Sequence, residues 1–155
     1  SAIAFCPKST YDYPLDTRGV IQHEAGGHGF GKLADEKIAI NGFIPNDEIA
    51  NINSKHALGR YQNVSSTGKM HKVPWSHLIF DERYSNDVDI FEGGCMYSRG
   101  VFRSEQNSCM NNYIPYFNTI SREAIVKRIM EYAGESYSFE EFVKNDKVEQ
   151  PKYSL

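Results

Sequence analysis

The chain has 155 residues, of which 40% are hydrophobic and 24% are charged, and its 17 basic and 20 acidic side chains give a net charge of −3. This is ordinary globular composition, and a chain of this length buries about 70% of its unfolded surface, so we expect one domain over residues 1–155. The pI of about 5.9 and the scattered basic residues argue against a nucleic-acid partner. No apolar run approaches the ~20 residues of a membrane span, so none is expected.

Turn residues and apolar spacing predict both strands and helices. Residues 1–8 read as a short strand, and a helix is expected over residues 17–29. A second helix is expected over residues 46–64, and the run that ends at Phe80 looks like a strand. Residues 84–118 are rich in Gly, Ser and Asn, which indicates loops around short strands. Residues 121–132 are the clearest amphipathic helix, with Ser121 as its cap, and a short helix follows from Ser138.

The three cysteines, Cys6, Cys95 and Cys109, allow one disulfide and leave one thiol over. We predict the bridge between Cys95 and Cys109, which flank a loop-like stretch. Closing a loop of about 15 residues adds roughly 3 kcal/mol in the chain-entropy model. The alternative is three reduced, buried thiols, as is common in intracellular proteins.

The segment HEAGGHGFGKLADE, residues 23–36, carries the strongest chemical signal. In zinc peptidases, an H-E-x-x-H helix places two histidines one turn apart on the metal, and its glutamate polarises the attacking water. Here the pair is His23 and His28, which are five residues apart. In an ideal α-helix this spacing separates the two side chains by roughly 140°.

A π-bulge absorbs one extra residue, and such bulges are frequent at functional sites. Gly26 and Gly27 favour one because they leave ordinary helical dihedrals at low cost. The spacing also resembles the H-E-x-x-G-H motif of dipeptidyl peptidase III, a zinc enzyme. We therefore expect His23 and His28 to bind zinc, with Glu24 as the general base that takes a proton from water and passes it to the leaving amine.

The wider string resembles the IgA-peptidase family of bacterial zinc metallopeptidases, metallopeptidase family sixty-four. HGFGKLADE resembles the segment around the second zinc-binding histidine of that family, and FEGGCMYSRGVFRSEQNSCM resembles its downstream block. PWSHLI and SREAIVKRI also fit the family layout, so the resemblance covers most of residues 20–132. It implies a secreted hydrolase that acts on a protein or peptide, and it leaves the substrate undetermined.

The resemblance also implies the remaining site residues. A metzincin-like layout puts the third ligand at Ala34, which cannot bind metal, so Asp35 is preferred and Glu36 is the second choice. Two imidazoles, one carboxylate and a water make an open catalytic zinc site. Met110 is expected in a turn beneath the metal, and Tyr113 or Tyr97 is expected to donate to the oxyanion.

Two further side chains are expected near this site. Glu92 is expected to have a structural role, holding a loop near the metal. His77, next to Trp75, is a reserve candidate for the cleft, although a structural role is the default for it.

These features together predict an α/β, metzincin-like zincin catalytic domain with the active-site helix under a small sheet. Only about 20 residues precede His23, so we expect a domain that lacks upstream strands and forms the C-terminal part of a longer protein. The oligomeric state is left open. No leader is visible, and localisation outside the cytoplasm, as a secreted, periplasmic or surface protein, rests on the resemblance. The alternative function is a non-catalytic surface binding module that retains the metalloprotease shape.

Overall fold

A computed structural model describes residues 3–149. Its first helical segment combines α1 (Thr17–Ile21) with a π-helix, η1 (Gln22–Gly31), which continues α1 directly. Asp16 caps the start of α1, because its carboxylate accepts a hydrogen bond from the backbone N–H of Arg18. Lys32 ends η1 in the left-handed conformation, with φ of 54°. The predicted helix at residues 17–29 is thus confirmed, and it extends two residues further.

The predicted strand at the N-terminus is wrong for the part of it that the structure describes, because residues 3–8 pair with no strand. Instead, this segment lies along the surface before α1. Ser9 links this segment to the start of α1, because the backbone N–H of Ser9 donates a hydrogen bond to the hydroxyl of Thr17. Ile3 and Phe5 stay largely exposed, so there is no buried face that would favour a strand here.

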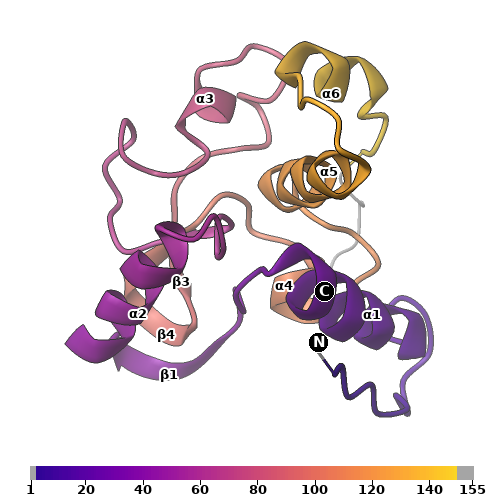
Figure 1. Cartoon of the computed structure of the whole chain (residues 1–155). Helices are drawn as coiled ribbons and strands as arrows, with labels where there is room; N and C mark the ends of the chain where they lie inside the picture. Colours follow the sequence, from indigo (N-terminus) through magenta and orange to yellow (C-terminus); the bar gives the residue numbers. More distant parts are fainter. Residues whose placement is uncertain (1–2, 150–155) are drawn as a thin grey trace.

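The sheet is small and mixed, and the long strand β4 (Met96–Arg103) is at its centre. β3 (Phe91–Gly94) and the two-residue β2 (Val64–Ser65) pair with β4 antiparallel, whereas β1 (Ile38–Phe43) pairs with it in parallel. The strands expected within residues 84–118 are therefore β3 and β4. The sheet packs with α2 (Asn46–His56), whose Ile52 joins Val64 and Val101 in a buried cluster (Figure 1).

Two sequence predictions near the sheet need correction. The helix expected over residues 46–64 ends at His56, because Gly59 and Tyr61 adopt positive φ angles and turn the chain back. The run ending at Phe80 is a short helix, α3 (Ser76–Ile79), rather than a strand. Periodicity cannot separate a buried strand from a buried helical turn over so short an apolar run.

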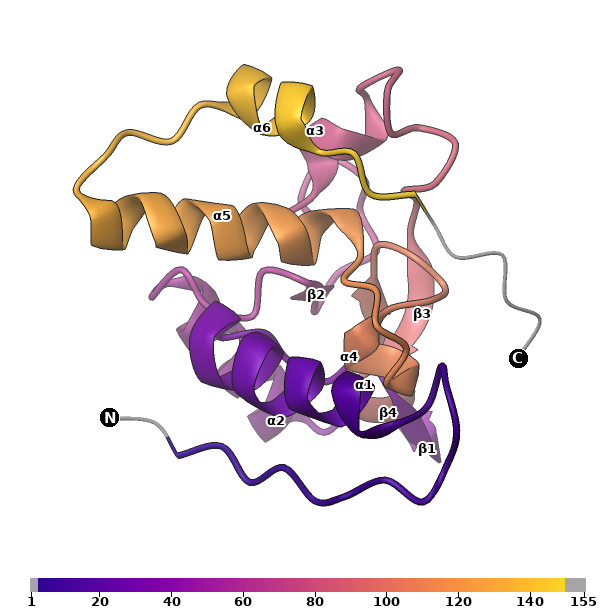
Figure 2. The same ribbon diagram turned by 90° about the vertical axis from the view of Figure 1, so that its right-hand side faces the viewer.

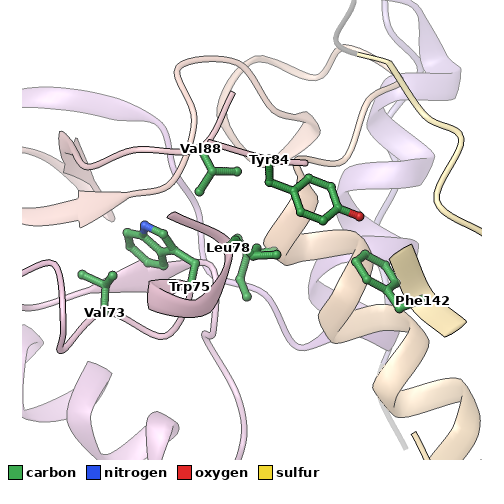
Figure 3. Packing of buried hydrophobic residues seen from close by; sticks show 7 residues of the cluster. Val73, Trp75, Leu78, Tyr84, Val88 and Phe142 are labelled. Carbon is green, nitrogen blue, oxygen red and sulfur yellow. The ribbon is translucent and has the colours of Figure 1, made fainter. Parts of the chain in front are cut away.

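A second core lies away from the sheet, where α3 meets α5 (Thr119–Ala133) and α6 (Phe139–Asn145). Trp75 and Leu78 are fully buried in it, and Phe142 of α6 belongs to the same cluster, where its ring lies beside that of Tyr84 (Figure 3). The indole N–H of Trp75 donates to the carbonyl of Asp89 at 2.9 Å, which satisfies its one polar group. This core fixes α5 in place, and α5 in turn runs beside η1 (Figure 2).

The helix predicted over residues 121–132 is α5, but its cap is Asn118 rather than Ser121. The Asn118 side chain accepts a hydrogen bond from the backbone N–H of Ser121, so α5 begins two residues earlier than expected. The short helix expected from Ser138 is confirmed as α6, and Ser138 caps it by accepting a hydrogen bond from the backbone N–H of Glu141.

The predicted disulfide is wrong. All three cysteines are free; Cys109 is fully buried at the start of the short helix α4 (Cys109–Asn112), and Cys95 lies between β3 and β4. In the described range, no helix has the length and apolar character needed to cross a bilayer. The fold is a mixed α/β domain with a small mixed sheet and several helices.

Candidate metal centre

The π-helix brings the two histidines together. The ring centroids of His23 and His28 lie 4.7 Å apart, with the ring planes at 89°. A π-helix closes its hydrogen bonds one residue later than an α-helix, so its wider turn returns the fifth residue to the same face. The expanded spacing is accommodated as predicted, although the π geometry extends over ten residues rather than a single bulge.

The glycines of η1 allow side chains from elsewhere to pack tightly against it. A Cβ at Gly27 would lie 2.2 Å from Sδ of Met110, and one at Gly26 would lie 3.3 Å from the Phe117 ring. Met110 is fully buried in α4, which contacts η1. This close approach therefore favours glycine at position 27.

Asp35 completes a group of three potential ligands. Its Oδ1 lies 3.1 Å from Nε2 of His23, and its Oδ2 lies 3.5 Å from Nε2 of His28. One donor atom from each of the three residues falls within 4.8 Å of the others. Two ligand atoms bound tetrahedrally at about 2 Å from one zinc ion lie about 3.3 Å apart, so these separations fit zinc.

Hydrogen bonds to the backbone orient both imidazoles. Nδ1 of His23 lies 2.8 Å from the carbonyl oxygen of Cys109, and Nδ1 of His28 lies 2.9 Å from that of Leu33. A carbonyl only accepts, so each Nδ1 carries the proton and each Nε2 turns a lone pair toward Asp35 in the neutral ring. In metal sites a histidine ligand commonly donates its other ring N–H to a backbone carbonyl, and the Nδ1 contacts of His23 and His28 have this arrangement.

Three electron-pair donors that face one another repel unless a positive charge lies among them. A proton on Nε2 or a metal cation removes that repulsion. The hydrogen bond with Asp35 raises the pKa of His28 above its ordinary value. Burial raises the pKa of Asp35, but hydrogen bonds and charges of the two histidines outweigh it and hold that pKa well below 3.8. The donor set therefore fits a divalent cation.

Glu36, the second choice for the third ligand, is turned away from His23 and His28. Its side chain is fully buried, and its carboxylate accepts hydrogen bonds from the side-chain amides of Asn63 and Asn118 at 2.9 Å. Burial raises its pKa to about 7 in spite of these bonds. Glu36 thus ties the loop after η1 to the start of α5, and Asp35 alone faces the histidines.

Glu24 is half-buried on η1, and its charge contributes to the raised pKa of His28, so the carboxylate lies close to that ring. Within residues 3–149, no hydrogen-bond or ion-pair partner is found for its carboxylate. Such a carboxylate can accept a proton without breaking an existing contact.

The turn carrying Met110 packs against the helix that carries the histidines. Ser108 caps α4 by accepting the backbone N–H of Met110, and the carbonyl of Cys109 binds His23. Met110 is not one of the three potential ligands. Its side chain packs against Gly27, and its backbone carbonyl accepts a hydrogen bond from the backbone N–H of Glu36. Met110 therefore helps to fix the part of η1 that carries His23 and His28.

The two tyrosines expected to donate to the oxyanion are placed differently. The ring of Tyr113 lies 4.4 Å from that of His23, so it borders the cluster. Tyr97 instead packs against the buried cluster of the sheet. Tyr61 was not anticipated: it is half-buried, and the Asp35 charge contributes to the elevation of its pKa, which burial dominates. Its position depends on a backbone turn, for which the sequence offers no clear signal.

Two other predicted residues have structural contacts. Glu92 accepts the backbone N–H of Gly100 at 2.9 Å and so joins β3 to β4. His77 lies 2.9 Å from the carboxylate of Glu123 on α5, which supports the default structural role rather than a place in the cleft.

Comparisons with known proteins do not assign this chain to a family. No protein-family profile matches the sequence, and no curated protein sequence matches it.

Proposed function

We propose that this protein is a zinc-dependent metallopeptidase of the IgA-peptidase type, with a metzincin-like active site. The observation that carries the proposal is the convergence of His23, His28 and Asp35, with both imidazoles oriented through Nδ1. Three protein ligands leave a fourth position open, which is typical of catalytic rather than structural zinc.

Zinc in such a site supplies a Lewis acid that lowers the pKa of a water molecule toward about 7 and polarises a peptide carbonyl. Glu24 directly follows His23 on the same helix, and its carboxylate has no hydrogen-bond or ion-pair partner among residues 3–149, so it takes the proton from the attacking water. It then returns that proton to the nitrogen of the leaving amine. This role requires the Glu24 carboxylate to lie beside the peptide bond that is cleaved.

Tyr113 is the proposed hydroxyl donor to the developing oxyanion, because its ring borders His23. Tyr97 stays a weaker proposal, since it packs in the sheet core. Lys37 lies over the Tyr113 ring at 5.4 Å and places a positive charge on the same side of the cluster. Secretion or display at the cell surface belongs to this proposal as well.

The second candidate function is a surface binding module that retains the shape without turnover. The unpartnered carboxylate of Glu24 favours catalysis, because a structural zinc ion requires no base beside it.

Zinc content and peptide cleavage test the proposal together. We expect about one zinc ion per chain by mass spectrometry and cleavage of a peptide library by the zinc-loaded protein. Glu24→Gln should keep the zinc and lose at least about 100-fold in turnover. Glu82→Gln, at an exposed acidic residue, is the matched control and should change neither. Bound zinc without Glu24-dependent turnover would favour the binding module, and absence of zinc binding would remove both.

A further inference from the structure

A cavity of about 260 Å³ opens directly beside His28. Its other lining residues are the apolar Leu33, the aromatic Tyr61 and three basic side chains, Lys32, Lys55 and Arg60. Because His28 belongs to both the cavity and the candidate metal-ligand cluster, the cavity adjoins the site at which a substrate would bind. We call it the basic pocket.

The backbone holds the three basic residues in fixed relative positions. Arg60 donates its backbone N–H to the carbonyl of Lys55, and Tyr61 donates to that of Lys32, each at 2.9 Å. Lys32 also donates from Nζ to the carbonyl of Gly29 at 2.6 Å, where it caps the end of η1. The pocket is therefore built by two chain reversals that meet, one after η1 and one after α2.

The positive charge in the basic pocket is not balanced by the protein. Among residues 3–149, no carboxylate lies within ion-pair distance of Lys55, Arg60 or Lys32. By contrast, Arg122 and Lys127 each pair with an acid at 2.8 Å. Asp35 and Glu48 carry negative charges that help to raise the pKa of Tyr61, which burial raises most, but Asp35 faces the histidines instead.

We infer that the basic pocket binds a side-chain carboxylate of the peptide substrate, so that the enzyme selects peptides with Asp or Glu next to the cleaved bond. This inference rests on the proposed peptidase function. Half-buried cations recognise a carboxylate more strongly than exposed ones, because less water competes for the charge. Leu33, which is 1% exposed, gives the pocket an apolar floor for the aliphatic part of that side chain.

The test measures peptide binding apart from turnover. The zinc-loaded Glu24→Gln protein is titrated with pairs of blocked alanine-based octapeptides that differ only by Glu or Gln at one central position. We expect the Glu peptide to bind about tenfold more tightly at its preferred position. An unblocked peptide that has a free C-terminal carboxylate but no acidic side chain tests whether the pocket binds the end of the peptide rather than a side chain.

Substitutions then assign the preference to the basic pocket. The double variant Lys55→Gln and Arg60→Gln should reduce the Glu-over-Gln ratio to below about twofold. Lys72→Gln removes an exposed lysine outside the pocket and should leave the ratio unchanged. Circular dichroism checks that each variant is folded. Equal binding of the two peptides, no binding, tighter binding of only the chain-end peptide, or a preference that survives the double variant would overturn the inference.

Turnover by the wild-type protein separates this inference from the proposed function. If library peptides are cleaved without a preference for acidic residues, the inference about the basic pocket is wrong and the peptidase proposal stands. Selective binding of the Glu peptide without any cleavage would instead reject the peptidase and leave a carboxylate-binding pocket.

Discussion

Replacing Gly27 by alanine tests whether the turn beneath the metal site is packed as the structure has it. The added methyl group would lie 2.2 Å from Sδ and 2.9 Å from Cε of Met110. Ordinary contacts between such atoms begin near 3.5 Å, so Met110 has to move by more than 1 Å from a position where it has no solvent exposure. Overpacking of this kind costs about 1–3 kcal/mol, and methionine is flexible, which favours the lower part of that range.

Gly26→Ala is the matched control, because it changes the neighbouring residue of the same helix. Its methyl group would lie 3.3 Å from the Phe117 ring, which a small shift relieves. Helix propensity alone predicts that both substitutions stabilise the protein by up to about 1 kcal/mol. Packing predicts different outcomes for the two substitutions: a net loss of about 1 kcal/mol for Gly27→Ala, after the propensity gain is subtracted, and no loss for Gly26→Ala.

Urea unfolding followed by far-UV circular dichroism, with a chelator present, measures both effects without a contribution from bound metal. In a Met110→Ala background the added methyl group has room, so Gly27→Ala should lose its penalty. Displacement of Met110 also disturbs the carbonyl of Cys109 that orients His23, so zinc affinity should fall about tenfold. A Gly27→Ala protein as stable as the parent would show that the packing reasoning is incorrect.

Three further predictions follow from single side chains. Asp35→Asn should weaken zinc binding at least about 100-fold in a competition titration, whereas Glu36→Gln should keep zinc and lower the free energy of unfolding by about 1–3 kcal/mol; the reverse pattern would exchange their roles. Burial raises the pKa of Glu123, but hydrogen bonds and a lysine partner outweigh it and lower that pKa from 4.5 to about 2. The ionised Glu123 side chain therefore stabilises the fold by up to about 3 kcal/mol above pH 4.5, and this stabilisation is lost as the pH falls toward 2. Unfolding free energies at pH 7 and pH 3 should therefore differ less in Glu123→Gln than in the parent, and an equal difference would reject this assignment. Burial raises the pKa values of Cys95 and Cys109 to about 12, so both should resist alkylation in the folded protein at pH 8, and a cross-linked peptide in the mass spectrum would contradict the free thiols.

Several local features were predictable from the residues alone. The helix that carries the two histidines, the widened turn between His23 and His28 and the short helix from Ser138 all appear in the structure. Each depends on hydrogen bonds within a few residues, or on glycine where the backbone departs from the α-helix. Such signals survive in the sequence because the interacting groups are neighbours along the chain.

The sequence predictions were wrong where contacts between residues far apart in the chain determine the structure. The run at α3 was read as a strand, and Ser121 was read as a cap that Asn118 provides instead. The predicted bridge between Cys95 and Cys109 treated a loop as if its ends met, whereas strand β4 carries the chain from one cysteine to the other side of the sheet. A pattern of residue types fixes neither the direction of a loop nor the depth at which an apolar run is buried.

The sequence determined which side chains could hold a metal, because their chemistry and helical spacing are local properties. Tertiary structure decided between Asp35 and Glu36, which are adjacent and chemically alike. Asn63 and Asn118, from two other segments, take the Glu36 carboxylate into the interior, and that leaves Asp35 to face the histidines. Tertiary structure also assembled the basic pocket from two separate turns, since its charges become neighbours only when those turns meet.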